Sequence, residues 1–255
     1  MIMARVISCV SGKGGVGKTT FVANLGIAAS SFGHKTIVMD ANLTTPNLGF
    51  HLGVPLYPQT IHNLLRGEGN IYDAMYIHPS DLKVIPAGLS IYDLKNTDPS
   101  KLKKVIDDLR EDHDLIILDG AAGLGKESLA SIEAADEVII ITNPELPSVT
   151  DALKTIKIAE EMKKPVIGVV VNRVRKMKSE LTKHDIESIL SAPVITTIHE
   201  DKKMADCIAA KTPIMSYDKN HDAAIEIKKI AAELTDNFWS PPKKDLMFIL
   251  KRIFS

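Results

Sequence analysis

Short apolar segments alternate with longer amphipathic segments along most of the chain. Several apolar segments are rich in Val and Ile at consecutive positions, which is typical of strands that are buried on both faces of a sheet. They predict strands at 5–10, 35–40, 82–86, 115–119, 137–142, 166–172 and 194–197. Between them, apolar residues recur at helical spacing, which predicts helices at 18–32, 61–66, 101–111, 127–133, 149–162, 181–190, 201–209 and 220–236.

This alternation of strands and helices predicts the fold class. Repeated strand–helix–strand units favour parallel strands that are joined by right-handed crossovers. We therefore expect an α/β protein with a doubly wound, mostly parallel sheet and helices on both faces. Ser240, Pro241 and Pro242 interrupt the pattern, which divides the chain into a globular domain at 1–236, a linker at 237–242 and a short terminal amphipathic helix at 243–255.

Composition narrows the functions that the domain can have. A chain of 255 residues with 45% hydrophobic content can bury a large core. Its net charge of −1 provides no general attraction to nucleic acid, so a nucleic-acid partner is not expected. Cys9 and Cys207 are isolated, which argues against a disulfide or a metal site and favours a reducing cytosol. No stretch approaches the roughly 20 apolar residues of a membrane-spanning helix.

A glycine-rich loop lies between the first predicted strand and the first predicted helix. Gly12, Gly17, Lys18 and Thr19 match the pattern G-x-x-x-x-G-K-[ST]. Glycines let backbone N–H groups turn inward around an anion, and the helix N-terminus adds positive potential. We expect Lys18 to reach the β- and γ-phosphates of a nucleotide and the Thr19 hydroxyl to ligate Mg²⁺. The predicted nucleotide-binding loop comprises Gly12, Lys13, Gly14, Gly15, Val16, Gly17, Lys18, Thr19 and Thr20.

A second lysine, Lys13, lies inside this loop, where an ordinary phosphate-binding loop needs none. With this signature the chain resembles the deviant Walker-A ATPases, the class of P-loop NTPases that contains MinD, ParA and the nitrogenase iron protein. The resemblance implies binding of ATP with Mg²⁺. It also implies that Lys13 crosses a dimer interface to the ATP phosphates of a second subunit. The alternative is a solvated loop lysine.

Two further strand ends carry residues that match motifs of this family. Asp40 and Asn42 occupy an Asp-x-Asp element, in which the first residue lies near the metal and the second positions the attacking water. The amide of Asn42 can orient water but cannot accept its proton, so we expect slow hydrolysis, either natural or from an introduced change. Asp119 resembles the Walker-B carboxylate that holds Mg²⁺; the alternative is an Asp that merely ends a strand. The implied catalytic residues are Lys13, Lys18, Asp40 and Asn42, and the implied metal site is Thr19, Asp40 and Asp119.

Later loops resemble the parts of the family that contact the nucleotide. Gly123 follows the Walker-B strand and is implied to direct a backbone N–H to the γ-phosphate. Asn172, followed by Arg173, is implied to read the adenine edge; the alternative is an Asn that caps a strand. Glu145 is implied to reach the ribose of the partner's nucleotide, and it also suits the start of a helix. The basic run 173–178 is a solvated loop, or alternatively a patch for nucleic acid or an acidic partner.

The resemblance extends over residues 5–236 and into the tail, and Thr44-Thr45-Pro46-Asn47-Leu48 is similar to the MinD branch. It implies an ATP-dependent dimer that acts as a spatial-positioning switch, at the cell-division site or a related one, together with an unidentified activating or effector protein. Three alternatives stay open: a ParA-type partitioning ATPase, a regulator of flagellum or array placement, and a non-hydrolysing scaffold.

The terminal segment predicts an amphipathic helix. At 100° per residue, one face gathers the apolar side chains and the other gathers Lys244, Asp245, Lys251 and Arg252. Such a helix suits the interface of an anionic membrane, which predicts a cytoplasmic protein that is peripheral on the inner face of the cell membrane. The alternative is a helix docked on the protein itself. The apolar face consists of Leu246, Met247, Ile249, Leu250, Ile253 and Phe254.

Overall fold

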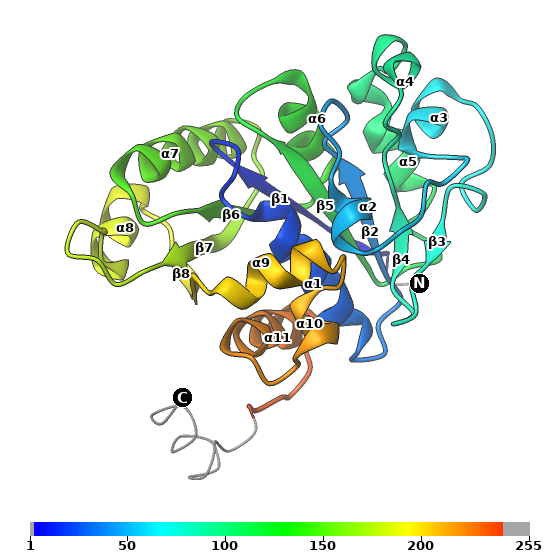
Figure 1. Ribbon diagram of the computed structural model, residues 1–255. Helices are drawn as coiled ribbons and strands as arrows, with labels where there is room; N and C mark the ends of the chain where they lie inside the picture. The colour runs from blue at the N-terminus through cyan, green and yellow to red at the C-terminus, as the bar shows by residue number, and fades with distance from the viewer. Residues whose placement is uncertain (1–2, 242–255) are drawn as a thin grey trace.

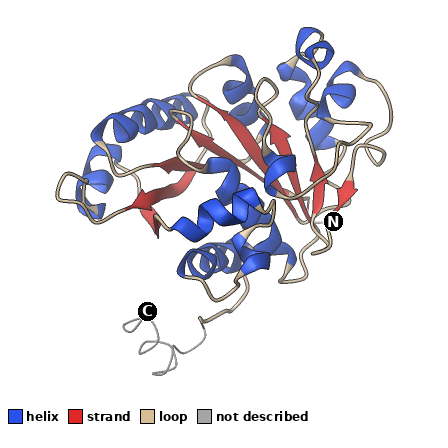
Figure 2. Cartoon of the chain, viewed as in Figure 1, coloured by secondary structure: helices blue, strands red, loops and turns tan. Residues whose placement is uncertain are grey.

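The computed structural model, which describes residues 3–241, contains an eight-stranded sheet with helices on both faces (Figures 1 and 2). The strand order is β3-β4-β2-β5-β1-β6-β7-β8, and every neighbouring pair is parallel except β3–β4. The predicted doubly wound, mostly parallel α/β fold is therefore confirmed. The strands are β1 (Arg5–Ser11), β2 (Thr36–Ala41), β3 (Tyr76–Ile77), β4 (Lys83–Ile85), β5 (Leu115–Ala122), β6 (Glu137–Thr142), β7 (Val166–Val174) and β8 (Val194–His199).

The helices form two layers, because the central strands are apolar on both faces and both faces need cover. One face packs against α1, α2, α9, α10 and α11, and the other packs against α3 and α5 to α8 (Figure 1). The helices are α1 (Lys18–Ser30), α2 (Leu48–His51), α3 (Ile61–Arg66), α4 (Ile91–Lys95), η1 (Pro99–Lys101), α5 (Leu102–Asp107), α6 (Lys126–Ala134), α7 (Leu146–Glu161), α8 (Lys183–Leu190), α9 (Lys202–Ala209), α10 (Ile214–Tyr217) and α11 (Asp222–Leu234).

The predicted elements agree with the structure best where the apolar pattern is long. The strand 137–142 and the helix 61–66 have the predicted bounds, and the other predicted elements are present with ends shifted by a few residues. The helix expected at 101–111 ends at Asp107 and is preceded by η1. The pattern did not predict β3, α2, α4, η1 or α10, because two to five residues are too few to establish a period.

The strand order places the glycine-rich loop at the centre of the sheet. β1 lies between β5 and β6, so chain connections leave in opposite directions on its two sides, and ligands of such sheets gather at the carboxyl ends of these strands. The terminal helix expected at 243–255 lies outside the described residues. Within 3–241, no helix is both long enough and apolar enough to cross a membrane.

Candidate functional site

The glycine-rich loop, residues 11–17, is shaped by close contacts with the backbone around it; we call it the phosphate loop. A Cβ at Gly12 would lie 2.3 Å from the backbone carbonyl carbon of Asp151 on α7, so this position cannot carry a side chain. Gly17 has a φ of 92° and ends the loop at the first residue of α1. Only glycine adopts this left-handed conformation without strain. The loop therefore wraps a site at the N-terminus of α1.

A cleft of about 740 Å³ opens in front of this loop. Of the residues predicted from the sequence, those at 14–20, Asn42 and Arg173 line it, while Asp40 lines a smaller neighbouring cavity. Gly12, Lys13, Asp119, Gly123, Glu145 and Asn172 are not part of its wall. Several lining residues come from elsewhere in the fold and were not predicted as site residues: Thr44, Thr45, Asn47, His51, Thr97, Pro99, Lys126, Glu127 and Ile208.

A buried ion pair joins the start of α1 to β5. Nζ of Lys18 lies 2.5 Å from Oδ1 of Asp119, and the two side chains are 7% and 0% exposed. Oδ2 of Asp119 is buried and has no hydrogen-bond partner in the part of the chain that the structure describes. A buried carboxylate oxygen without a partner is costly, so Asp119 fits a cation, and Thr19 lies in the adjoining cleft wall.

Asp40, at the end of β2, accepts three backbone hydrogen bonds. Its Oδ1 accepts from the N–H of Asn42 at 3.1 Å, and its Oδ2 accepts from the N–H groups of Asn47 and Leu48 at 3.0 Å. Burial and then the charge of Asp119 raise the pKa of Asp40 to about 7, against the opposing effect of the N–H groups. Asp40 thus holds the following loop in place, and its role at the metal stays a prediction.

No group of three or more His, Cys, Asp or Glu side chains within residues 3–241 is arranged to hold a metal ion. The predicted set contains only two carboxylates and one hydroxyl. Mg²⁺ ordinarily keeps several waters and is bound through one or two carboxylates together with phosphate oxygens. The residues present suit a cation that arrives with a nucleotide.

Residues 42–47, which we call the Asn42 loop, are held by polar side chains. Nδ2 of Asn42 donates to the carbonyl oxygen of Thr45 at 2.7 Å, and its Oδ1 accepts from the Thr45 hydroxyl at 3.1 Å. The N–H and hydroxyl of Thr44 both donate to the carboxylate of Glu127 in the first turn of α6. Asn42 therefore lies in the cleft wall as expected, but its amide bonds to its own loop.

Asn172, at the end of β7, contacts the phosphate loop directly. Its Nδ2 donates to the carbonyl oxygen of Val16 at 2.7 Å and would lie 2.1 Å from a Cβ at Gly17. Asn172 therefore braces this loop, a role that the sequence did not reveal, and the reading of adenine stays a prediction. Arg173, with a φ of 58°, places its side chain in the cleft wall.

Three other predicted residues, Lys13, Gly123 and Glu145, differ in whether they have a hydrogen-bond partner within the described chain. The Lys13 side chain is half-buried and makes no hydrogen bond or ion pair within residues 3–241. The N–H of Gly123 donates to the carbonyl oxygen of Ser11 at 2.9 Å, so a contact with a γ-phosphate requires an exchange of this bond. Oε1 of Glu145 accepts from Nη2 of Arg175 at 2.8 Å. The predicted intersubunit roles of Lys13 and Glu145 stay predictions.

These features define a class. A mostly parallel sheet carries a glycine-rich loop between β1 and α1, and the lysine that begins α1 pairs with a carboxylate on β5, which is the arrangement of a P-loop nucleotide-binding protein. The chain belongs to the CobQ/CobB/MinD/ParA nucleotide binding domain family, whose model matches residues 7–214. The resemblance inferred from the phosphate loop is thereby confirmed.

Comparisons with individual proteins agree with this family membership. The chain is 40% identical over 233 residues to an uncharacterized ATP-binding protein of Methanocaldococcus jannaschii, a match that covers 91% of this chain and 88% of that protein. The cell division ATPase MinD of Pyrococcus furiosus superposes with a TM-score of 0.87 at 33% identity, over 92% of this chain and 99% of that one. MinD of Pyrococcus horikoshii, described as complexed with Mg-ADP, gives 0.87 at 30% identity over 91% and 96%.

Proposed function

We propose that this chain is a MinD-type ATPase switch, which binds ATP with Mg²⁺, pairs with a second copy and separates again after hydrolysis. The observation that carries this proposal is the buried pair of Lys18 and Asp119 at the phosphate loop. Membership of the MinD/ParA family supports the ATPase activity, and the likeness to MinD structures favours a role in positioning cell division or a related process.

The binding step depends on residues of the phosphate loop. The backbone N–H groups of the loop and the Lys18 ammonium would hold the phosphates, while Thr19 and Asp119 would hold Mg²⁺, the cation described in the P. horikoshii relative. When bound, the metal neutralises charge that develops on the phosphates. The expected result is ATP affinity that falls at least 100-fold in Lys18→Ala, measured by calorimetry.

Hydrolysis is expected to be slow because of Asn42. Its side chain lies in the cleft wall and is neutral, so it can orient a water molecule but cannot accept a proton. None of residues 42–47 carries a carboxylate, so no side chain of the Asn42 loop can accept the proton in place of Asn42. A single-turnover assay with labelled ATP gives the rate, and a wild-type rate that Asn42→Asp leaves unchanged would contradict the assignment of this position.

Pairing of two subunits rests on Lys13. Its ammonium has no partner within residues 3–241, although it lies beside a site for a highly charged ligand. A second subunit's phosphates would supply that partner in a space shielded from water. Light scattering should give a dimer in ATP and a monomer in ADP. Lys13→Ala should stay monomeric in both, whereas Lys103→Ala, on α5 and paired with Asp107, should behave as wild type.

The predicted membrane helix at 243–255 lies outside the described residues, and its proposed role comes from the sequence. One such helix binds weakly, and two on a dimer bind better because the second attaches at high effective concentration. Anionic liposomes should therefore pellet the protein in ATP but not in ADP. Ile249→Glu should abolish pelleting without loss of ATP binding, and pelleting that survives removal of 243–255 would contradict the proposal.

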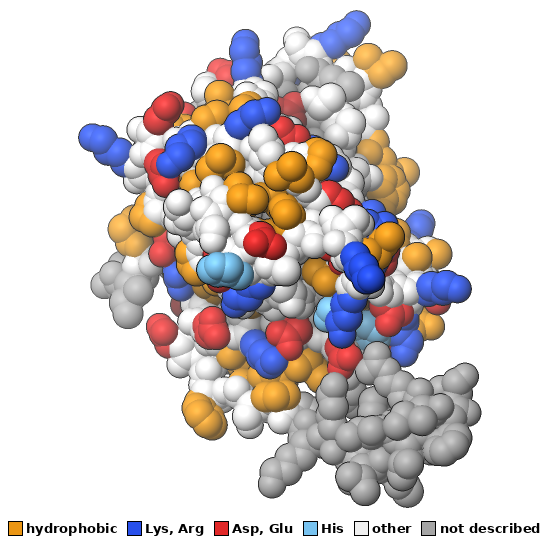
Figure 3. Space-filling model, turned by 90° about the vertical axis from the view of Figure 1, so that its left-hand side faces the viewer, with side chains coloured by type: hydrophobic (Ala, Val, Ile, Leu, Met, Phe, Trp, Pro, Cys, Tyr) orange, Lys and Arg blue, Asp and Glu red, His pale blue; other side chains and the backbone are white. Residues whose placement is uncertain are grey.

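Binding to nucleic acid is not proposed. The basic run 173–178 is partly neutralised, because Arg175 contacts the carboxylates of Glu145, Glu180 and Glu200 at 2.8, 3.2 and 3.8 Å. On the face shown in Figure 3, Lys and Arg side chains are interspersed with Asp and Glu. A continuous basic surface is the usual electrostatic footprint of a DNA-binding protein, and this face of the described residues does not carry one.

A further inference from the structure

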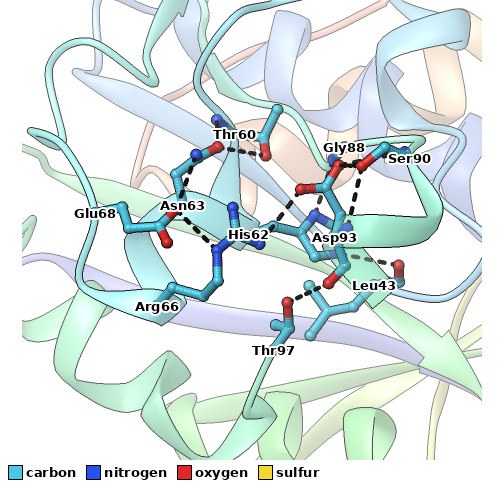
Figure 4. A network of polar contacts seen from close by, with 10 residues as sticks. All are labelled: Leu43, Thr60, His62, Asn63, Arg66, Glu68, Gly88, Ser90, Asp93 and Thr97. Carbon is cyan, nitrogen blue, oxygen red and sulfur yellow. Dashed lines mark hydrogen bonds and ion pairs between the residues drawn. The ribbon is translucent and has the colours of Figure 1, made fainter. Parts of the chain in front are cut away.

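A fully buried histidine lies behind the Asn42 loop and has no part in the function proposed above. His62, in α3, is 0% exposed and stands at the centre of the polar network in Figure 4. The N–H of Gly88 donates to its Nδ1 at 2.9 Å, and its Nε2 lies 3.2 Å from the carbonyl oxygen of Leu43. Because a backbone N–H can only donate, Nδ1 must accept and the proton must reside on Nε2.

Each of these two bonds leads to the wall of the nucleotide cleft. Leu43 is the residue between Asn42 and Thr44, both of which line the cleft. His62 therefore holds the carbonyl group of the residue that lies between two cleft-lining residues of the Asn42 loop. Loss of this bond leaves the segment held at its two ends by the Asp40 carboxylate, and between them only by exposed polar side chains.

The second bond leads to the segment between β4 and η1. A Cβ at Gly88 would lie 2.2 Å from Oδ2 of Asp93, so Gly88 is pressed against this carboxylate. Asp93 completes the capping box of α4 with Ser90, pairs with Arg66 at 3.3 Å, and accepts at its carbonyl oxygen from the Thr97 hydroxyl at 2.5 Å. Thr97, whose bond to Asp93 is drawn in Figure 4, itself lines the cleft.

We propose that His62 is a positioning residue for ATP hydrolysis, which sets the place of Asn42 by tying the Leu43 carbonyl to the Gly88 segment through a single neutral tautomer. This inference deepens the proposed function and rests on it. Protonation at Nδ1 would set an N–H against the N–H of Gly88 and break one of the two bonds.

The pH at which His62 becomes protonated depends on its burial and on the charged groups around it. Asp93 on α4 and Glu127 on α6 favour the charged imidazole, while Arg66 on α3 opposes it. Burial is the largest influence and lowers the pKa of His62, so the neutral form that makes both bonds is the one present near neutral pH. The rate of ATP hydrolysis should therefore fall as the pH is lowered.

The test compares His62→Gln with His62→Leu. The Gln amide can accept from Gly88 and donate to Leu43, whereas Leu can do neither. We expect His62→Leu to lower kcat about 10- to 100-fold, the scale of an ångström-level misplacement, with ADP affinity within about threefold of wild type. His62→Gln should retain most of kcat and should lose less of it on acidification than wild type, the remaining loss coming from Asp40, whose pKa is raised to about 7.

The matched control is His113→Leu, since His113 is also buried, at 3% exposure, but bonds to the carbonyl oxygen of Leu109 in the turn after α5 and does not line the cleft. It should leave kcat unchanged even if the melting temperature falls. Equal losses of kcat in His62→Leu and His113→Leu, or equal losses in Leu and Gln at position 62, would overturn the proposal.

Hydrogen–deuterium exchange over residues 42–47 gives a readout that needs no hydrolysis. Exchange there should accelerate in His62→Leu and stay near wild type in His62→Gln and His113→Leu. If wild-type protein does not hydrolyse ATP, the proposed function fails, while this exchange pattern still tests the tie to Leu43. Unchanged exchange in folded His62→Leu would overturn the inference by itself.

Discussion

The phosphate loop and the Asn42 loop line the same cleft but are held in different ways. The phosphate loop is held by close packing, with Gly12 pressed on the backbone of α7 and Gly17 pressed on the side chain of Asn172. The Asn42 loop is held by hydrogen bonds to side chains, chiefly those of Asp40 and Glu127. Close packing leaves no room for a second arrangement, whereas hydrogen bonds of about 1 kcal/mol each can be exchanged for bonds to a ligand.

The difference separates two tasks within one site. A loop that must present N–H groups to phosphates in a fixed geometry benefits from rigid support. A loop that must respond to the number of phosphates needs contacts that break and reform. Substitutions in the first loop should therefore abolish binding, and substitutions in the second should change rates and local motion.

The largest expected effect is that of Lys18→Ala, directly after the rigid phosphate loop. The change removes the ammonium that meets the phosphates and leaves the buried carboxylate of Asp119 unpaired. Calorimetry should show ATP affinity reduced at least 100-fold. Loss of one partner of a buried pair also destabilises a protein by about 3–5 kcal/mol, so the titration is done well below the variant's melting temperature. Near-normal affinity in a folded variant would contradict the site.

Two glycines of the phosphate loop provide a matched pair. An added Cβ at Gly12 meets the backbone of Asp151, whereas one at Gly14 meets nothing within 4 Å. Gly12→Ala should lower the free energy of unfolding by about 1–3 kcal/mol, as overpacking does, and should weaken ATP binding. Gly14→Ala should leave the free energy of unfolding unchanged, because its added Cβ meets no protein atom. Chemical denaturation measures the first effect, and equal stabilities of the two variants would remove the basis for calling this loop rigid.

In the Asn42 loop, Asn42→Asp should leave ATP affinity nearly unchanged and raise the hydrolysis rate about tenfold or more. The reason is that a carboxylate can accept a proton from the attacking water, and general-base terms contribute about 10²–10⁴. Phosphate release under single-turnover conditions measures the rate. A loss of affinity with no gain in rate would place position 42 with the binding residues instead.

The smallest effect is a pH dependence of stability that comes from His62. Its pKa is lowered in the folded protein, so below about pH 6.5, the ordinary value, the unfolded chain binds more protons and the folded state loses stability as pH falls. Gln at this position does not titrate. The free energy of unfolding of His62→Gln should therefore improve relative to wild type between pH 7 and pH 5, and a constant difference would contradict this assignment.

The sequence predicted the parts of the site that are local in the chain or that end neighbouring strands. The phosphate loop is one continuous motif, and Lys18 and Asp119 meet, although they are 101 positions apart, because β1 and β5 are parallel neighbours. Other contacts follow from packing between distant elements, which no local pattern encodes. The bond of Asn172 to Val16 and that of Glu127 to Thr44 are of this kind.

The pair of Lys18 and Asp119 has a thermodynamic consequence for what the cleft accepts. A phosphate group that draws the Lys18 ammonium to itself leaves Asp119 as a buried charge with neither oxygen paired. A divalent cation that arrives with the phosphates removes this cost. Since linkage is reciprocal, cation and nucleotide each raise the affinity of the other by the same factor. The pair thus makes the cleft selective for the complete metal–nucleotide complex over either component alone.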